Sequence, residues 1–363
     1  KRFDTAYDRD FRKRHGLTAG LHFNKETWGV DRFVPMPPGW RGMPLAGSTL
    51  TAEEAVSQMP VSAAAQTEIL RLLTIEEDVL PNIPVADRAA YLSTISYRDF
   101  LTRHIGITEP EVFKMLQDQT GDIGLGIDSV DAYLALTYSG MPGRAAAGLP
   151  KEEEGEPYIH HFPDGNASIP RLLVRSMIPD VAPGNTMEDI VTASFDYSKL
   201  DQDFSPVRVR LNSTVTRVEH EGDPATAETV AVSYVRDGQA FRVRASGCIL
   251  ACNNSIIPYL CPELPPRQAK ALAEQVKQPL IHTNVALRNW RPWKKLGIYS
   301  AGSPGAFHKG VQLDFPVSLG DYAYSGGPDE PIVVIMYRSP SVANQGLTAK
   351  QQYRATRYEL LST

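Results

Sequence analysis

Apolar residues between positions 51 and about 140 recur at three- and four-residue steps, which is the spacing of amphipathic helices. The groups that carry this pattern are Ile69-Leu70-Leu72-Leu73, Tyr91-Leu92-Ile95, Phe100-Leu101-Ile105 and Val112-Phe113-Met115-Leu116. Ser96 before Tyr97, and Pro110 after Glu109, are residue types that favour the start of a helix. This region is therefore predicted to be a helical subdomain.

After residue 201, apolar and polar residues alternate, as is typical of strands. The alternation predicts strands at 207–211, 215–218, 229–235 and 240–243, with a hairpin turn at Asp237-Gly238. The apolar run 246–251 predicts a short buried strand, followed by a turn or helix start at Asn253-Asn254. Further along, the patterns predict a helix at 267–276, strands at 280–287 and 332–337, and a closing helix at 349–361.

The first fifty residues mix aromatic and charged residues and become rich in Pro and Gly in their second half, which predicts a long irregular loop. Together these elements predict an α/β (α+β) fold. With 363 residues, of which 42% are hydrophobic and 22% charged, the chain can bury two cores.

The net charge of -5 provides no broad basic surface, so we expect no nucleic-acid partner. No stretch approaches the roughly 20 apolar residues that would cross a bilayer, and Lys1-Arg2-Phe3-Asp4 lacks the apolar core of a signal peptide. Cys248, Cys252 and Cys261 form an odd set in an apolar region without a nearby second ligand pair. We therefore expect buried thiols, with no disulfide framework and no metal site.

Two sequence motifs contain residue types that can take part in binding or catalysis. His160-His161-Phe162-Pro163-Asp164-Gly165-Asn166-Ala167-Ser168 precedes apolar residues at helical spacing, with Ser168 or Asn166 placed to cap that helix and Gly165 to permit a turn. Leu280-Ile281-His282-Thr283-Asn284-Val285-Ala286-Leu287-Arg288 runs into Trp290-Arg291-Pro292-Trp293. By themselves these motifs indicate a loop-to-helix junction and a strand followed by a turn.

Both motifs resemble segments of the flavin amine oxidase superfamily. The resemblance implies that Phe162, Asp164, Gly165 and Asn166 pass beside the isoalloxazine of FAD. It also implies that the strand 210–219 brackets the adenine at Val215, and that Ala251 and Cys252 end a strand at the cofactor crevice. The order of motifs along the chain is most similar to that of bacterial spermidine dehydrogenases. It runs from Tyr7-Asp8-Arg9-Asp10-Phe11 through Ser96-Tyr97-Arg98-Asp99-Phe100-Leu101 to Cys261-Pro262-Glu263-Leu264-Pro265.

In that superfamily a lysine early on the substrate-domain strand holds a water against flavin N5, and its place falls on His282 here. Imidazole is shorter and titrates near pH ~6.5, but it can still hold water or accept a proton. A hydrogen-bonded core histidine is the competing interpretation. The expected reaction is hydride transfer from the carbon beside nitrogen to the flavin, followed by imine hydrolysis.

An amine substrate also needs a carboxylate and aromatic walls. We assign the carboxylate to Asp128 and Asp131, although Asp is common at helix starts and the pattern favours ordinary solvated helix residues there. We assign the walls to Trp290 and Trp293, with core residues as the alternative. Members of this family can carry haem as well as FAD, and His160, His161 and His308 are the candidate haem ligands. The resemblance also implies a periplasmic location.

The resemblance divides the chain into three parts. Residues 1–200 are mainly substrate and helical domain with the N-terminal loop, 201–265 are part of a Rossmann-like FAD-binding domain, and 266–363 are the substrate-domain sheet and closing helix. The sequence has no G-x-G-x-x-G, and Gly124-Leu125-Gly126-Ile127-Asp128-Ser129 lacks the third Gly. We therefore expect a fragment whose pyrophosphate-binding segment is missing. A flavin enzyme acting on a non-amine and a cofactor-free binding protein remain open alternatives.

Overall fold

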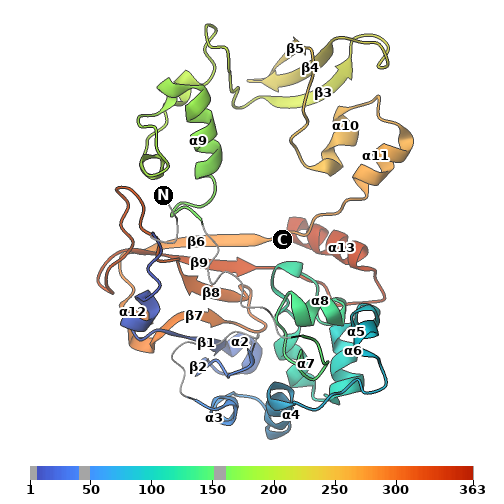
Figure 1. The fold of residues 1–363 in the computed structure, drawn as a ribbon, viewed down its shortest axis with the longest axis vertical. Helices are drawn as coiled ribbons and strands as arrows, with labels where there is room; N and C mark the ends of the chain where they lie inside the picture. Colours follow the sequence, from blue (N-terminus) through green and yellow to red (C-terminus); the bar gives the residue numbers. More distant parts are fainter. Residues whose placement is uncertain (1–5, 41–49, 151–160, 363) are drawn as a thin grey trace. The chain divides into compact units, whose positions relative to one another are not determined.

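The computed structural model describes residues 6–40, 50–150 and 161–362, in two compact units (Figure 1). Unit 1 comprises Lys1–Pro163 and Gln278–Thr363, and unit 2 comprises Asp164–Lys277. The predicted mixed α/β fold is confirmed, because a mixed sheet and a set of helices together form unit 1. The functional labels given to the parts of the chain stay predictions.

Unit 1 is built on a six-stranded sheet in the order β2-β1-β7-β8-β9-β6. All neighbouring strands in it are antiparallel except β1 and β7, which are parallel. The strands are β1 (Thr18–Phe23), β2 (Arg32–Pro35), β6 (Ile281–Leu287), β7 (Ile298–Gly302), β8 (Gly310–Leu313) and β9 (Ile332–Arg338). The prediction of a long irregular loop over the first fifty residues is thus wrong, since β1 and β2 form one side of this sheet.

The predicted helical subdomain is confirmed. Its helices are α3 (Ala52–Val56), α4 (Ala63–Thr74), α5 (Val85–Leu92), α6 (Tyr97–Phe100), α7 (Pro110–Leu116) and α8 (Ala132–Thr137), with a π-helical turn η3 (Leu101–Ile105) and a 3₁₀ turn η4 (Gly121–Ile123). The Ser96 hydroxyl accepts a bond from the Asp99 amide and so caps α6, and Pro110 begins α7. Both predicted helix starts are correct.

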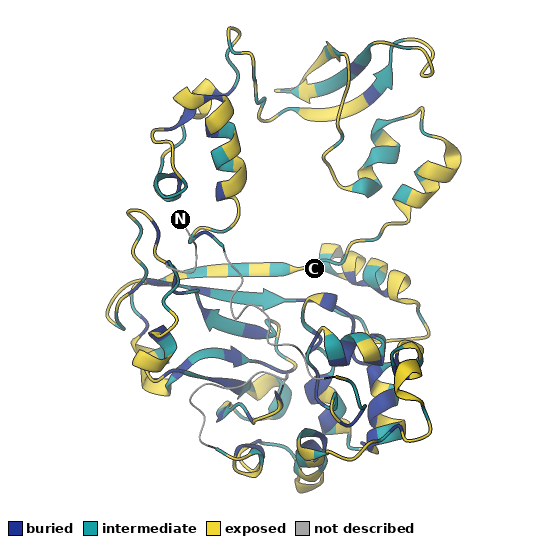
Figure 2. Ribbon diagram, in the orientation of Figure 1, coloured by how far each residue is buried: buried dark blue, intermediate teal, exposed yellow. Residues whose placement is uncertain are grey.

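The helical subdomain packs on one face of the sheet, on the side formed by β1 and β2. Leu21, Phe23 and Val34, from β1 and β2, share a buried apolar cluster with residues of the helices. The opposite face has a separate cluster that joins Phe11 of α1 (Phe11–Arg14) and Trp290 to Leu313, Ile332 and Val334. Short helices α2 (Lys25–Trp28) and α12 (Arg291–Leu296) and the closing helix α13 (Ala349–Ser362) complete the unit. Dark blue residues in Figure 2 mark how much of this unit is buried.

Unit 2 contains α9 (Ser168–Met177), three 3₁₀ turns, η5 (Pro179–Val181), η6 (Asp189–Val191) and η7 (Tyr197–Lys199), and a three-stranded antiparallel sheet in the order β3-β4-β5. Its strands are β3 (Thr214–His220), β4 (Val230–Arg236) and β5 (Gln239–Ala245), followed by η8 (Asn254–Ile256), α10 (Ile257–Leu260) and α11 (Pro266–Ala273). Asp237 and Gly238 both have positive φ, at 51° and 75°, as a two-residue hairpin turn requires. The predicted hairpin is therefore confirmed.

Two of the strands predicted for this unit do not form. Residues 207–211 are not a strand, although Val207 and Val209 pack on a small cluster around Ile178 and Leu200. The apolar run 246–251 is also not a strand, and Ile249 within it is 94% exposed. In both cases the side-chain pattern is that of a strand, but no strand among the described residues pairs with the backbone.

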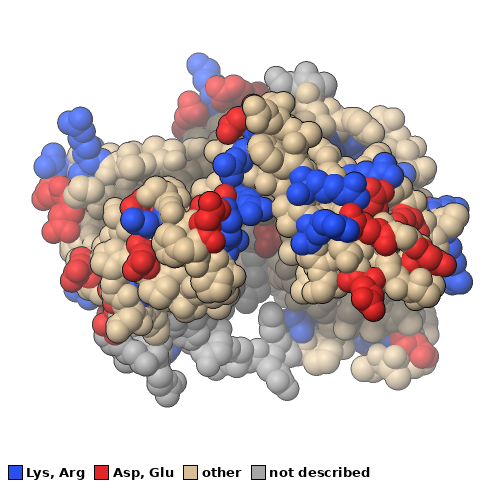
Figure 3. All heavy atoms as spheres, turned by 90° about the horizontal axis from the view of Figure 1, so that it is seen from above, with Lys and Arg blue, Asp and Glu red and all other residues tan. Residues whose placement is uncertain are grey.

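Charges on the three-stranded sheet form a ladder of alternating sign. Arg217 pairs with Glu219, while Arg242 reaches Glu219 and Glu221, and Arg244 also pairs with Glu221. Figure 3 shows basic and acidic side chains next to one another on the face in view.

None of the helices in the described part of the chain is long and apolar enough to cross a membrane.

Candidate functional site

Strand β6 carries His282 on an exposed face. His282, Asn284 and Ala286 are exposed, whereas the residues between them are half-buried, so the strand has one open side and one packed side. The predicted strand is confirmed and lies at an edge of the six-stranded sheet. The catalytic role of His282 stays a prediction.

The register extends this open side across the sheet. His282 lies directly opposite Tyr337 of β9, and Asn284 lies opposite Ile335, which in turn lies opposite Gln312 of β8. Directly paired residues of antiparallel strands have their side chains on the same face. We call this surface, made of His282, Asn284, Ala286, Gln312, Ile335 and Tyr337, the β6 face.

The β6 face and the helical subdomain share one side of the sheet. Tyr337 pairs with Gly310, Gly310 with Gly302, and Gly302 is level with Leu21, which packs on the helices. The helices thus cover the β1–β2 side of this sheet face, and the β6 side of the same face carries the exposed polar residues. This arrangement gives a polar surface bordered by a helical wall.

A largely buried ion pair lies at this border. Lys309, just before β8, pairs with Asp118, which follows α7, and their side chains are only 11% and 18% exposed. The Ser341 hydroxyl donates to Asp118 Oδ1 at 2.9 Å. A cavity of about 10 Å³, close to the volume needed for one water, lies between Asp118, Gln119, Gly121, Lys309, Tyr337 and Ser339. Sequence periodicity could not reveal this pair, because its members come from distant segments.

The two aspartates predicted to bind the amine make structural hydrogen bonds. Asp131 caps α8 by accepting from the Leu134 amide at 2.8 Å. Asp128 accepts from Gln117 Nε2 at 3.0 Å and from the Asn344 amide at 3.0 Å, which ties the segment before α13 to the helical subdomain. These contacts match the alternative interpretation of both residues as structural, and a substrate role stays a prediction.

Trp290 is a core residue. It is 0% exposed, and its indole N–H donates to Ser325 Oγ at 2.9 Å. Trp293 is half-buried against the same cluster. Of the two predicted walls, Trp290 therefore has no surface to offer a ligand within unit 1.

The predicted isoalloxazine-side turn begins at the end of unit 1 with Phe162, which is buried. The ring of His161 contacts that of Phe315, with 4.8 Å between centroids, and its Nδ1 lies 2.7 Å from the Phe162 carbonyl oxygen. Among the other candidate haem ligands, His308 Nε2 lies 3.1 Å from Thr283 Oγ1, and His160 is outside the described residues. No structural observation favours haem ligation by these residues.

The remainder of the turn lies in unit 2. Asp164 accepts hydrogen bonds from Ser168 Oγ at 2.8 Å and from Arg171 at 3.0 Å. Gly165 has φ of 86°, with open space where a Cβ would lie. The predicted capping of α9 by Ser168 or Asn166 is wrong, because Ala167 is the N-cap residue and no side chain caps the helix. Ser168 instead lies inside the first turn and bonds Asp164, so the helix start and the loop are joined there.

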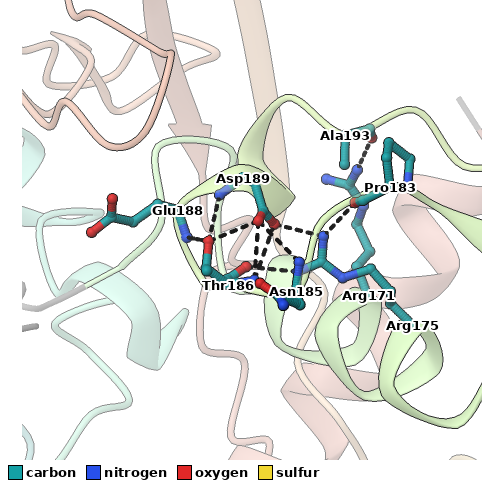
Figure 4. Close-up of polar contacts among 8 residues, drawn as sticks. All are labelled: Arg171, Arg175, Pro183, Asn185, Thr186, Glu188, Asp189 and Ala193. Atoms are coloured by element: carbon teal, nitrogen blue, oxygen red, sulfur yellow. Dashed lines mark hydrogen bonds and ion pairs between the residues drawn. The ribbon is translucent and has the colours of Figure 1, made fainter. Parts of the chain in front are cut away.

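A second arginine of α9 anchors the loop that follows the helix (Figure 4). Arg175, 4% exposed, donates to Asp189 Oδ1 and to the carbonyl oxygens of Pro183 and Thr186. Desolvation would raise the pKa of Asp189, but hydrogen bonds from Arg175 and Thr186 hold this pKa well below its ordinary value. Arg171, four residues earlier, links Asp164 to the Ala193 carbonyl. The i, i+4 spacing of the two arginines was the available sequence signal for this network, and the sequence interpretation missed it.

The remaining predicted cofactor residues are accessible. Val215 on β3 is 37% exposed, and Ala251 and Cys252 are exposed in the segment before η8. The expectation of buried thiols is wrong for Cys248 and Cys252, which are exposed, while Cys261 is half-buried. Their segment has no strand partner among the described residues, so the apolar side chains of the segment stay at the surface.

Comparison with known proteins yields matches among solved structures alone. No protein-family model matches the sequence, and no curated protein matches it. Putrescine oxidase with bound putrescine is 15% identical over 91% of this chain and 61% of that one, with a TM-score of 0.42. A putrescine oxidase variant is 16% identical over 97% and 66% of the two chains, with a TM-score of 0.44. Cyclohexylamine oxidase from Brevibacterium oxydans is 11% identical over 90% and 58%, with a TM-score of 0.37.

The chain therefore spans less than two thirds of the length of these structures. At these identities and TM-scores the matches transfer no activity to this chain.

Proposed function

We propose that this chain supplies the amine-binding surface, and part of the flavin-binding surface, of a FAD-dependent enzyme that oxidises an amine, with a polyamine such as spermidine as its substrate. The observation that carries the proposal is the β6 face. The strand whose sequence resembles the substrate strand of flavin amine oxidases is an edge strand, and it presents His282 outward. The motif that follows this strand begins with the buried Trp290.

The residues present fit contacts to a flavin at two positions. The positive φ of Gly165 and the open space beside it permit close approach of a planar ring to the backbone. Val215 leaves an apolar contact accessible on β3. The sequence contains no glycine-rich pyrophosphate motif, so the proposal assigns that contact to residues outside this sequence.

When bound, the flavin would accept a hydride from the carbon beside the amine nitrogen. In this proposal His282 holds a water or accepts a proton at its imidazole, and Asn284 and Tyr337 supply further polar groups along the same surface. The helical subdomain beside the face would limit access of bulk water. Such positioning is the protein's main contribution when the cofactor carries the chemistry.

The test uses the complete gene product, purified and titrated with FAD while flavin fluorescence and absorbance are recorded. We expect bound flavin, and anaerobic bleaching of its visible absorbance by spermidine. His282→Ala should slow bleaching by about 100-fold, the lower range for loss of an acid–base group. His22→Ala, which removes another half-exposed histidine from the same sheet, should bleach at the wild-type rate.

Three outcomes would contradict the proposal. A product that binds no flavin would favour the cofactor-free binding protein. Bleaching by a substrate other than an amine, with no response to polyamines, would favour the non-amine flavin enzyme. Equal rates for His282→Ala and wild type would remove His282 from the mechanism and leave the cofactor assignment intact.

A further inference from the structure

Asp314 is a half-buried carboxylate directly after β8. Its Oδ1 accepts a hydrogen bond from the Phe315 amide at 2.8 Å, and its carbonyl oxygen accepts one from the Tyr324 hydroxyl at 2.7 Å. Within the described parts of the chain, no Lys, Arg or His forms an ion pair with it. The backbone around this carboxylate is thus fixed, while Oδ2 has no protein partner there.

The register places Asp314 on the same side of the sheet as His282. The Asp314 amide donates to the Val333 carbonyl at 2.9 Å, so the β8–β9 pairing continues for one residue beyond Leu313. Side chains alternate along a strand, so Asp314 shares a face with Gln312 and Val333. Gln312 belongs to the β6 face, and Asp314 therefore extends that surface.

The separation between the two groups follows from strand geometry. His282 is level with Gly310 through Tyr337, and Asp314 lies four residues after Gly310. Four residues at about 3.3 Å each and two strand spacings of about 4.8 Å give roughly 16 Å between their Cα atoms. Such a span suits an elongated ligand with polar groups at both ends better than a compact one.

The surroundings of Asp314 favour a cation. Burial raises the pKa of Asp314, and the Phe315 amide and the nearby His161 act in the opposite direction. Burial and the charge of Asp314 also raise the pKa of Tyr322, which indicates that the phenol lies near the carboxylate. A partly desolvated carboxylate without a paired cation is costly, and a bound ammonium group would offset that cost.

We propose that Asp314 binds a positively charged nitrogen of the substrate, at the part of the β6 face remote from His282, and so selects amines that carry a second charge. This inference depends on the proposed function. It replaces Asp128 and Asp131 as the first choice of carboxylate, because hydrogen bonds within the protein already engage those two side chains. Both oxygens of Asp128 accept hydrogen bonds, and Asp131 Oδ1 is used to cap α8. Asp314 Oδ2 has no partner among the described residues, and Asp314 is the carboxylate that shares a face with His282.

The test compares Asp314→Asn with Asp321→Asn in the complete, flavin-loaded protein. Both changes remove one negative charge, and Asp321 is exposed on the same connection between β8 and β9. Flavin reduction is measured under anaerobic conditions with spermidine and with butylamine, which has one nitrogen. For Asp314→Asn we expect KM for spermidine to rise about 10- to 100-fold, as for loss of a charged hydrogen bond, with kcat changed less than about twofold. KM for butylamine should not change, and Asp321→Asn should match the wild type for both amines.

An equal rise of KM for both amines, or no rise for spermidine, would overturn the assignment. If the wild-type protein oxidises no amine, the proposed function fails on its own, and calorimetric titration with spermidine then tests Asp314 separately. Binding that is lost in Asp314→Asn and kept in Asp321→Asn would still support the cation site, whereas equal binding by both variants would refute it. Thermal unfolding checks the fold, and Asp314→Asn should be at least as stable as the wild type because it removes a partly desolvated charge.

Discussion

The Lys309–Asp118 ion pair joins the helical subdomain to the sheet, and its contribution to the free energy of unfolding can be measured by substitution. Lys309→Met would leave the Asp118 carboxylate in the same 18%-exposed environment with one hydrogen bond, from Ser341, and no counter-charge. Removing one member of a buried pair costs about 3–5 kcal/mol. Since both side chains keep some solvent contact, we expect the lower end, about 3 kcal/mol.

The assay is urea unfolding followed by tryptophan fluorescence, with the free energy of unfolding compared between variants. The matched control is Arg291→Met, which breaks a pair with Asp329 in which the side chains are 67% and 72% exposed. An exposed pair contributes about 0–1 kcal/mol, so the control should differ little from the wild type.

The double variant Asp118→Leu with Lys309→Met should recover most of the loss, because neither charge then needs a partner. If Lys309→Met costs no more than Arg291→Met, the pair is not effectively desolvated and the reasoning fails. If the double variant stays as unstable as Lys309→Met relative to the wild type, the pair itself contributes more than its desolvation costs.

Two further predictions concern unit 2. The pKa of Asp189 is lower in the folded chain than its ordinary value of 3.8. The contribution of Asp189 to stability is therefore present above pH 3.8 and is lost as the pH falls through the folded pKa. Asp189→Asn should lower the thermal midpoint at pH 7 more than at pH 3, and an equal loss at both would contradict this linkage. Cys248 and Cys252 are exposed, while burial and the two neighbouring thiols raise the pKa of Cys261. Ellman's reagent should therefore modify two thiols quickly and one slowly at pH 8. Cys261→Ser should remove the slow phase alone.

Local periodicity was sufficient for elements that are long or have clear end signals. The helices between residues 52 and 137 follow from apolar spacing and from the Ser96 and Pro110 starts. Strand β6 and the β4–β5 hairpin follow from alternation and from the Asp237-Gly238 turn. In these cases the residues themselves carry the geometric information.

Pairing between distant segments could not be predicted in this way. Strands β7 and β8 have five and four residues and contain glycines, so they produce almost no alternation, yet both are central in the sheet. Residues 207–211 alternate clearly and form no strand. Whether a strand forms is decided by a partner for its backbone hydrogen bonds, and one segment's pattern does not contain that partner.

The candidate site shows the same division. His282 was placed correctly on a strand. Its neighbours Tyr337 and Gln312, and the carboxylate of Asp314, come from strands β8 and β9 and the residue after β8, and the register brings them together. Asp128 and Asp131 lie near Tyr133 and Tyr138 in the sequence, but that proximity does not show that their oxygens already accept bonds from the protein.

The parallel pairing of β1 with β7 joins Thr18 to Ile298. During synthesis, β1 leaves the ribosome long before β7 exists, so the backbone edge of β1 that pairs with β7 must wait, although Leu21 and Phe23 can already pack on the helical subdomain. Residues 164–277 form a compact unit from one continuous stretch of sequence and can fold in the meantime. Contacts so far apart in sequence fold slowly and are prone to wrong associations while they wait. The order of translation thus delays completion of the sheet that carries His282 until β7, β8 and β9 have been made, after residues 164–277.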